Sequence, residues 1–320
     1  MESIVTSVVP LFTVILLGFI AGRRNLIGGA GLQALVTFVF SFAMPAFIFR
    51  MMAAKDLSAI DDWPVVLAYL SAQLPIFLGG LLLGAWLFRQ SMAEMTIQAF
   101  GSSFSNSVVL GLPLVLGLFG ERAGLPALLI ITLDIVIFSL ITVLLEIATI
   151  NNGSTAARPS RVAFHNLGRA LLFNPLIIAM VLGISVGMLG IVLPVPVETT
   201  LTFLGQAGPP AGLFALGATI GQRRAGGELG PIVGMISMKL IVHPLVAIVV
   251  LLFFNLDPIA ASVALLFAAC PVGANVYVFA AHYKAAVEIS ATAILVSTAV
   301  ALFSLSIIAW LLAKSAILPF

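Results

Sequence analysis

The stretch Ser105-Asn106-Ser107-Val108-Val109-Leu110-Gly111-Leu112-Pro113 interrupts an apolar segment that is otherwise long enough to cross a membrane. A second interruption, Cys270-Pro271-Val272-Gly273-Ala274-Asn275, lies in a later apolar segment. Each places helix breakers and an asparagine inside the span, where a backbone group freed from its helical bond is costly if lipid is its only neighbour. Such breaks persist only against protein or a water-filled cavity. Two of them, in corresponding positions of two halves, indicate the binding site of a secondary transporter.

The composition is that of a membrane protein. Of the 320 residues, 62% are hydrophobic and 8% are charged, whereas soluble domains have roughly 25% charged residues. The mean hydropathy of +1.23 leaves little room for a soluble domain. The single cysteine, Cys270, excludes an intramolecular disulfide and a cysteine metal cluster. The net charge of +2 is spread over short loops, so the chain has no basic face for a nucleic acid.

Apolar windows of about 20 residues, enough to cross a hydrocarbon core roughly 30 Å thick, follow one another along the chain. We identify ten of them, at residues 4–22, 32–52, 63–88, 95–119, 125–149, 170–190, 198–221, 230–254, 258–281 and 288–313. The first window has no convincing cleavage site and is interpreted as a retained span. The longest polar stretch, 151–169, lies near the midpoint and is interpreted as a linker between two halves.

Basic residues are distributed unevenly between the two sides of the membrane. Loops on the side of the first connection hold Arg23, Arg24, Arg89, Arg158, Arg161, Arg169, Arg223, Arg224 and Lys284. The opposite side holds Arg50, Lys55, Arg122 and Lys314. The positive-inside rule therefore predicts a multi-pass plasma-membrane protein with both termini outside.

An internal repeat relates the two halves. The residues Pro10-Leu11, Leu17-Gly18 and Gly22 recur 165 positions later as Pro175-Leu176, Leu182-Gly183 and Gly187. With the same offset, Thr37-Phe38, Pro45-Ala46 and Phe49 recur as Thr202-Phe203, Pro210-Ala211 and Phe214. Because each half holds an odd number of spans, the halves 1–155 and 156–320 are predicted to form an inverted repeat of five helices each. The offset aligns Asn106 with Pro271, so the two interruptions become broken, crossing helices in the fourth and ninth spans.

The residues at these interruptions resemble the auxin efflux carrier family, which includes plant PIN-type carriers and bacterial malonate and malate transporters. Asn106, Gly111 and Pro113 match its Asn-x4-Gly-x-Pro pattern. A second block in the last two spans agrees, and it comprises Pro271, Gly273, Val278, Phe279, Ala280, Tyr283, Ser290 and Ser297-Thr298. The resemblance covers essentially the whole chain, and the short linker is similar to that of bacterial members, which implies the bacterial inner membrane.

The resemblance implies a fold similar to the bile-acid sodium symporters. In that fold a core, or transport, domain of spans three to five and eight to ten slides as an elevator against a panel of spans one, two, six and seven. A homodimer through the panel helices would fit the same fold. Sodium-coupled relatives tend to carry an acid at the second crossover, and none occurs between Cys270 and Ala281. Of the two candidate coupling ions, H+ and Na+, the sequence therefore disfavours Na+.

The substrate-binding candidates surround the two breaks. Asn106 is either a direct substrate contact or a structural plug for the break at Gly111, and Asn275 is either a contact or a backbone cap. The other candidates at the breaks are Gly111, Pro113, Pro271 and Gly273. Pro45 and Pro210 are expected to kink the second and seventh spans, which the resemblance places facing the crossover.

Asp134, Lys239 and His243 are ionisable residues well inside the predicted spans. Lys239 is about ten residues, or roughly 15 Å, into the eighth span, where an unpaired charge is expensive. Asp134 lies at similar depth in the fifth span, so we predict a buried ion pair between them. This pair is either structural, or it replaces a bound cation or handles a coupling proton. His243 follows Lys239 on the same helical face and is either a proton carrier or a packing residue beside Pro244.

Catalytic motifs are absent from the sequence: it has no HExxH, Walker or GxSxG pattern, and we expect no enzyme, cofactor or metal site. The sequence predicts a secondary active transporter of small organic anions. Mono- and dicarboxylates such as malonate or malate are the expected substrates, with auxin-like acids as a further option. The alternative is a cation/proton antiporter of related fold in which Asp134 binds the cation. A channel or a nontransporting receptor is a third class.

Overall fold

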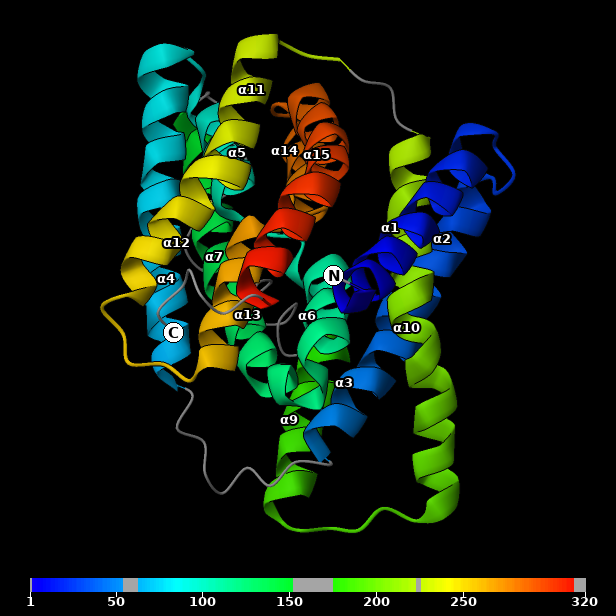
Figure 1. Ribbon diagram of the computed structural model, residues 1–320. Coiled ribbons are helices and arrows are strands. Elements are labelled where there is room, and N and C mark those ends of the chain that lie inside the picture. Colours follow the sequence, from blue (N-terminus) through cyan, green and yellow to red (C-terminus); the bar gives the residue numbers. More distant parts are fainter. Residues whose placement is uncertain (1, 54–62, 152–174, 223–225, 314–320) are drawn as a thin grey trace. The chain divides into compact units, whose positions relative to one another are not determined.

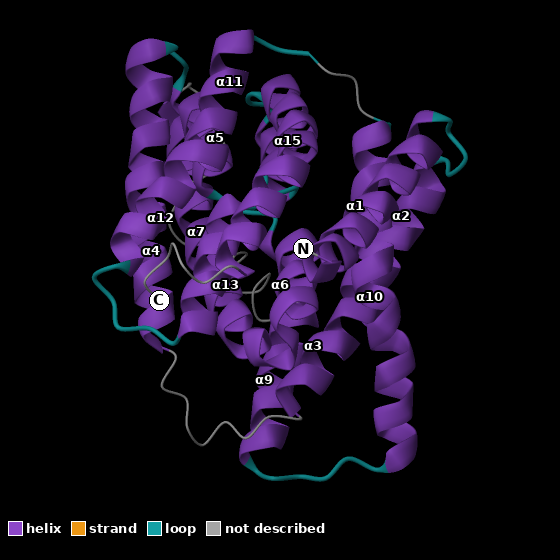
Figure 2. Cartoon of the chain, in the orientation of Figure 1, coloured by secondary structure: helices purple, strands orange, loops and turns teal. Residues whose placement is uncertain are grey.

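The computed structural model describes residues 2–53, 63–151, 175–222 and 226–313 (Figure 1). Every regular element within these ranges is a helix (Figure 2), so the predicted all-α class is confirmed. Helical segments long and apolar enough to cross a membrane are Gly29–Ala53, Trp63–Leu87, Ser107–Leu133, Leu229–Leu251 and Val287–Leu312. Shorter apolar helices are Val9–Arg23, Pro175–Met188 and Pro258–Ala269. The chain is thus a multi-pass membrane protein.

The chain forms two compact units, and each takes segments from both halves of the sequence. Unit 1 comprises residues 1–8, 62–164 and 223–320, and unit 2 comprises residues 9–61 and 165–222. At the last passage of the chain from unit 2 to unit 1, the residues on each side are hydrogen-bonded within their own unit. Gln222 Nε2 donates to the Ile27 carbonyl at 2.8 Å in unit 2. In unit 1, the Thr292 hydroxyl accepts from Gly226 N at 2.8 Å and donates to the Gly226 carbonyl at 2.7 Å.

Unit 2 is held together by close contacts between small residues. Its helices are α1 (Glu2–Arg23, from Val9 onward), α2 (Gly29–Phe38), η1 (Val39–Ala43), α3 (Met44–Ala53), α9 (Pro175–Met188) and α10 (Val195–Gly221). Gly18 and Gly22 of α1 lie directly against the Phe214 and Ala218 carbonyls of α10, so that an added Cβ would overlap them. This small-xxx-small spacing therefore serves helix packing, as it commonly does in membranes.

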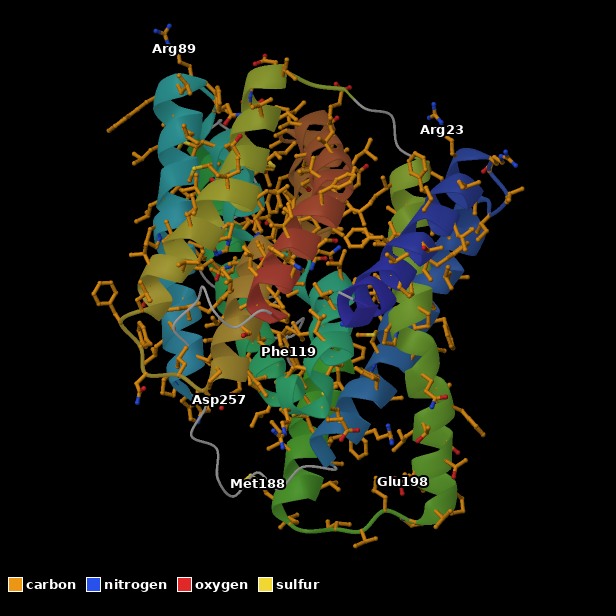
Figure 3. All side chains as sticks on the ribbon, viewed as in Figure 1. Arg23, Arg89, Phe119, Met188, Glu198 and Asp257 are labelled. Carbon is orange, nitrogen blue, oxygen red and sulfur yellow. The ribbon has the colours of Figure 1, made fainter. Side chains whose placement is uncertain are left out.

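Unit 1 holds both broken helices. Its elements are α4 (Trp63–Leu82), η2 (Leu83–Leu87), α5 (Met92–Ser103), η3 (Ser107–Gly111), α6 (Leu112–Phe119), η4 (Gly120–Ala123), α7 (Gly124–Asn151), α11 (Leu229–Ser237), η5 (Met238–Val242), α12 (His243–Leu251), α13 (Pro258–Ala269), α14 (Asn275–Tyr283) and α15 (Val287–Ala313). Helix α5 starts just after Arg89 and α13 starts just after Asp257, and these two residues lie at opposite ends of the unit (Figure 3). The carboxyl ends of α5 and α13 therefore meet inside unit 1.

Prolines in three helical segments are accommodated by a π turn. Within the described ranges, η1, η3 and η5 each end two residues before a proline, at Pro45, Pro113 and Pro244 respectively. A proline lacks the N–H and its ring clashes with the carbonyl four residues back, and the extra residue of a π turn moves that carbonyl away. The helices consequently continue through these prolines.

The first break lies earlier in the chain than the Gly-x-Pro pattern predicts. Helix α5 ends at Ser103, and Phe104 has an extended backbone with φ −86° and ψ 126°. Gly111 has helical angles of φ −63° and ψ −49°, and Pro113 lies in the first turn of α6. The prediction of a break at Gly111 is wrong, because the π turn absorbs the proline and the chain leaves the helix at Phe104–Asn106.

Candidate functional site

The two chain breaks pair with each other in unit 1. Asn106 N donates to the Pro271 carbonyl at 3.0 Å, and Gly273 N donates to the Phe104 carbonyl at 3.1 Å. These bonds form an isolated antiparallel bridge between Ser105 and Val272. Each break thereby supplies hydrogen-bond partners to backbone groups that the other exposes, which is the condition for irregular backbone at membrane depth.

Side chains from η5, α4 and the first break bind around the carboxyl end of α13. The Lys239 ammonium donates to the Ala268 carbonyl at 2.5 Å, and the Ser105 hydroxyl donates to the Phe267 carbonyl at 2.6 Å. Since the Ser105 hydrogen is used in that bond, the Tyr69 phenol donates to Ser105 Oγ, at 3.0 Å. The carboxyl end of a helix carries partial negative charge, so the Lys239 cation is placed where it neutralises that end.

The paired segments 104–106 and 271–273 form the crossover. Two further bonds fix it. Val272 N donates to Ser297 Oγ of α15 at 3.2 Å. Gln73 Nε2 of α4 donates to the Ser103 carbonyl at the end of α5, at 3.4 Å. The crossover is therefore held from α4, η5 and α15 as well as by its own backbone pair.

Asn106 is the polar side chain at the first break. It is 5% exposed, and its backbone carbonyl accepts from Leu110 N at 3.2 Å and from Gly111 N at 3.0 Å. Its side chain does not cap η3, and its Nδ2 is buried with no hydrogen-bond partner among the described residues. A buried unsatisfied donor costs about 1–3 kcal/mol. Backbone groups at this break are thus bonded by the main chain, and Asn106 Nδ2 has no described partner.

The other candidates at the breaks frame the crossover. An added Cβ at Gly111 would lie 2.9 Å from the Phe267 ring, and one at Gly273 would overlap the Phe104 ring. These glycines allow the two broken segments to approach each other closely. Pro113 is buried, and Pro271 contributes its carbonyl to the bridge. Asn275 is exposed in the first turn of α14, where a helix carries partial positive charge.

The remaining candidates divide between the units. Pro45 is half-buried and Pro210 is exposed, and both belong to unit 2. Asp134 belongs to α7, but its side chain lies outside the part of the chain that the structure describes. Its ion pair with Lys239 therefore stays a prediction. The partners described for the Lys239 ammonium are the Ala268 carbonyl and, at 3.2 Å, Nδ1 of His243.

The sequence reasoning missed the hydroxyl and amide side chains that hold the crossover. Tyr69 and Gln73 are four residues apart in the third span, and a pair of buried polar residues on one helical face was the available signal. An aromatic cluster next to the breaks was also missed, and it consists of Phe100, Phe104, Phe138, Phe279 and Tyr283. Tyr283 joins this cluster through Phe279, and its hydroxyl donates to Glu146 Oε1 at 3.1 Å.

Comparison with known proteins identifies relatives over the whole chain. A family model described as membrane transport protein matches residues 3–309. A protein named as a candidate malonate transporter from Rhizobium meliloti is 27% identical over 321 residues, covering 99% of this chain and 98% of the relative. An uncharacterised transporter from Methanothermobacter thermautotrophicus is 25% identical over 305 residues, covering 93% and 95%. A lysosomal cholesterol signaling protein of Mus musculus is 28% identical over 322 residues, covering 94% of this chain and 36% of the relative.

Proposed function

The chain belongs to the membrane transport protein family, as its resemblance to the auxin efflux carriers predicts, and from this premise we propose that it is a secondary active transporter of small organic anions. Malonate and related mono- or dicarboxylates are the proposed substrates, because the Rhizobium relative that matches the full length is named for malonate. Auxin-like acids share the carboxylate and form a second group of candidates. Two relatives are named as transporters, which is consistent with a role other than catalysis.

The observation that carries the proposal is the unpartnered Asn106 amide. Its Nδ2 is a buried hydrogen-bond donor at the meeting point of two broken helices, and a carboxylate oxygen is the acceptor that such a donor lacks. Helices η3 and α14 each begin at a break, and the start of a helix carries partial positive charge that favours an anion. A carboxylate at this position would complete the hydrogen bonding that the protein leaves open.

Lys239 supports an anion over a cation at this site. Inverted-repeat transporters commonly hold a coupling cation at the carboxyl end of a broken half-helix. In this chain the carboxyl end of α13 is already bound by the Lys239 ammonium. We therefore propose that Lys239 replaces a bound sodium ion and adds positive potential for the substrate. The same contact favours the anion carrier over the cation/proton antiporter.

The proposed architecture is a ten-span inverted repeat, 1–155 and 156–320, working as an elevator. Unit 1 would be the transport domain and unit 2 the panel, which Pro45 and Pro210 would shape toward the substrate. The segments that make up the two units, the repeated residues and the two broken helices support this assignment. A bacterial inner-membrane location with both termini outside, and a homodimer through the panel, belong to the same proposal.

Uptake of radiolabelled carboxylates into proteoliposomes tests the function. We expect saturable malonate uptake by the wild-type protein, and competition by unlabelled dicarboxylates. The Asn106→Ala variant should lose uptake, whereas Asn255→Ala, which changes an exposed asparagine in a loop of unit 1, should retain it. The absence of saturable uptake of any carboxylate, with and without ion gradients, would overturn the proposal.

A further inference from the structure

Lys239 and His243 form a buried pair of proton-binding groups beside the crossover. Both side chains are fully buried, and Lys239 Nζ lies 3.2 Å from His243 Nδ1. The π turn η5 sets their spacing, since the backbone N–H of His243 bonds to the Met238 carbonyl. The anion site described above uses the charge of Lys239 but gives no role to His243.

The contact determines which imidazole nitrogen carries the hydrogen. An ammonium only donates, so Nδ1 of His243 accepts from Lys239 and the neutral ring carries its hydrogen on Nε2. This second nitrogen is buried and has no hydrogen-bond partner within the described part of the chain. One ring nitrogen, Nδ1, thus accepts a hydrogen bond from Lys239, and the other, Nε2, carries a hydrogen that no described group accepts. That is the arrangement of a relay.

The relay lies next to the crossover. The Tyr69 and His243 ring centroids are 5.8 Å apart, and the Tyr69 phenol is bonded to Ser105, the residue before Asn106. One turn along α4 from Tyr69, Gln73 Oε1 is a second buried atom without a partner. His243 Nε2 and Gln73 Oε1 are thus a buried donor and a buried acceptor that have no described partner.

Few other ionisable groups surround the pair. The elements packed against η5 and α12 are α4, α5, α11, α13 and α15. Their acidic side chains occur at N-caps or in first turns, and these are Glu94, Glu228, Asp257 and Glu288. Tyr69 and Cys270 are the nearer titratable groups, and Asp134 on α7 is predicted at similar depth but has no described side chain.

We propose that Lys239 and His243 carry a proton that is transported together with the anion, an inference that rests on the proposed function. We call the pair loaded when it carries the transported proton. In this state Lys239 is an ammonium and His243 is neutral. Unloading moves a proton from Nζ to Nδ1, giving an amine and an imidazolium, and the imidazolium then releases its Nε2 proton to water. The pair ends neutral, with the remaining ring hydrogen on Nδ1, and loading reverses both steps.

The charge of the pair couples the proton to the substrate. The loaded pair places one positive charge at the carboxyl end of α13, and the unloaded pair places none. An anion at the crossover therefore binds better to the loaded state. By linkage, anion binding must equally favour protonation of the pair. Malonate binding to the wild-type protein should therefore take up protons, and malonate affinity should fall as the pH rises.

Proton uptake on malonate binding tests the inference. Purified protein in weak buffer with a pH-indicator dye is titrated with malonate at a pH where malonate is fully ionised, and binding is followed by thermal stabilisation of the same sample. We expect Lys239→Arg, which keeps a permanent charge, to lower the protons taken up per malonate at least about tenfold. His243→Gln removes the relay but leaves the amine of Lys239, so protons should be taken up at least about tenfold more slowly after malonate is added. The control His282→Gln changes an exposed histidine and should match the wild type.

The outcomes separate this inference from the proposed function. Wild-type protein that binds malonate without taking up protons overturns the inference alone, whatever the variants do. Normal proton uptake by Lys239→Arg, or an unchanged rate of proton uptake by His243→Gln, also overturns it. Wild-type protein that neither binds nor transports any carboxylate overturns the proposed function, and the inference falls with it.

Discussion

The two breaks in unit 1 are related by sequence position but are built differently. At the first, Asn106 is buried and its side-chain Nδ2 has no hydrogen-bond partner in the described chain. At the second, the preceding helix end is bound by Lys239 and Ser105, the strand is bound by Ser297, and Asn275 is exposed. The first break thus has a buried donor without a described partner, whereas the second is bound by a cation. If the proposed function is correct, the two breaks divide substrate binding and charge compensation between them.

The largest effect is expected when the donor at the first break becomes an acceptor. Asn106→Asp keeps the shape of the side chain but places a carboxylate against the substrate carboxylate, and like charges in contact cost several kcal/mol. We expect malonate affinity to fall more than about 100-fold. Asn275→Asp should have a much smaller effect, because its side chain is exposed. Equal losses in the two variants would remove the proposed difference between the breaks.

The next largest effect concerns the charge at the second break. Lys239→Met removes a cation whose attraction to a nearby buried anion is of order 2 kcal/mol, so malonate affinity should fall roughly 30-fold. Lys239→Arg should retain most of that affinity, which distinguishes loss of charge from loss of packing. Adding Asp134→Asn to Lys239→Met should recover thermal stability if the predicted ion pair exists. Unchanged affinity in Lys239→Met would contradict the electrostatic role.

A smaller effect is expected from the hydroxyl that fixes the second break. Ser297→Ala leaves the buried Val272 N–H without its described partner, at a cost of about 1 kcal/mol or somewhat more. The unfolding temperature, followed by size-exclusion fluorescence, should fall relative to Ser185→Ala. That control removes an exposed serine hydroxyl in unit 2. A variant as stable as the control would show that the strand does not depend on this bond.

The smallest effect is expected at the exposed asparagine of the second break. Asn275→Ala removes a side chain at the start of α14 that is not buried, so malonate affinity should change by about threefold or less. The same titration used for Asn106→Asp measures it. A loss as large as that of Asn106→Asp would assign Asn275 to the substrate and not to the helix start.

Much of this fold was predictable from the sequence because membrane helices have a strong signal. Apolar length and composition indicated the helical segments, and the interruptions near Asn106 and Pro271 indicated which segments break. The position of the first break was not predictable. Phe104 and Ser105 are not helix breakers, and the chain leaves the helix there because the second break supplies backbone partners. Pro113, which looked like the cause, follows a π turn instead.

The candidate site was predictable in its residue types but not in its contacts. The sequence placed Lys239 at midplane depth and proposed a carboxylate as its partner. The described partners are a backbone carbonyl and a histidine, because the end of a broken helix presents carbonyls that no pattern of side chains reveals. The same holds for Tyr69 and Ser297, whose roles depend on residues distant in sequence.

The affinity of the purified protein for malonate, measured by titration for wild type, Asn106→Ala and Asn255→Ala, tests whether the Asn106 side chain binds the substrate. If the Asn106 amide binds the substrate carboxylate, Asn106→Ala should lose about 10- to 100-fold in affinity, since a hydrogen bond to a charged group contributes about 1.5–3 kcal/mol. Its unfolding temperature should stay close to that of the wild type, and Asn255→Ala should bind normally. Unchanged malonate affinity in Asn106→Ala would contradict the account.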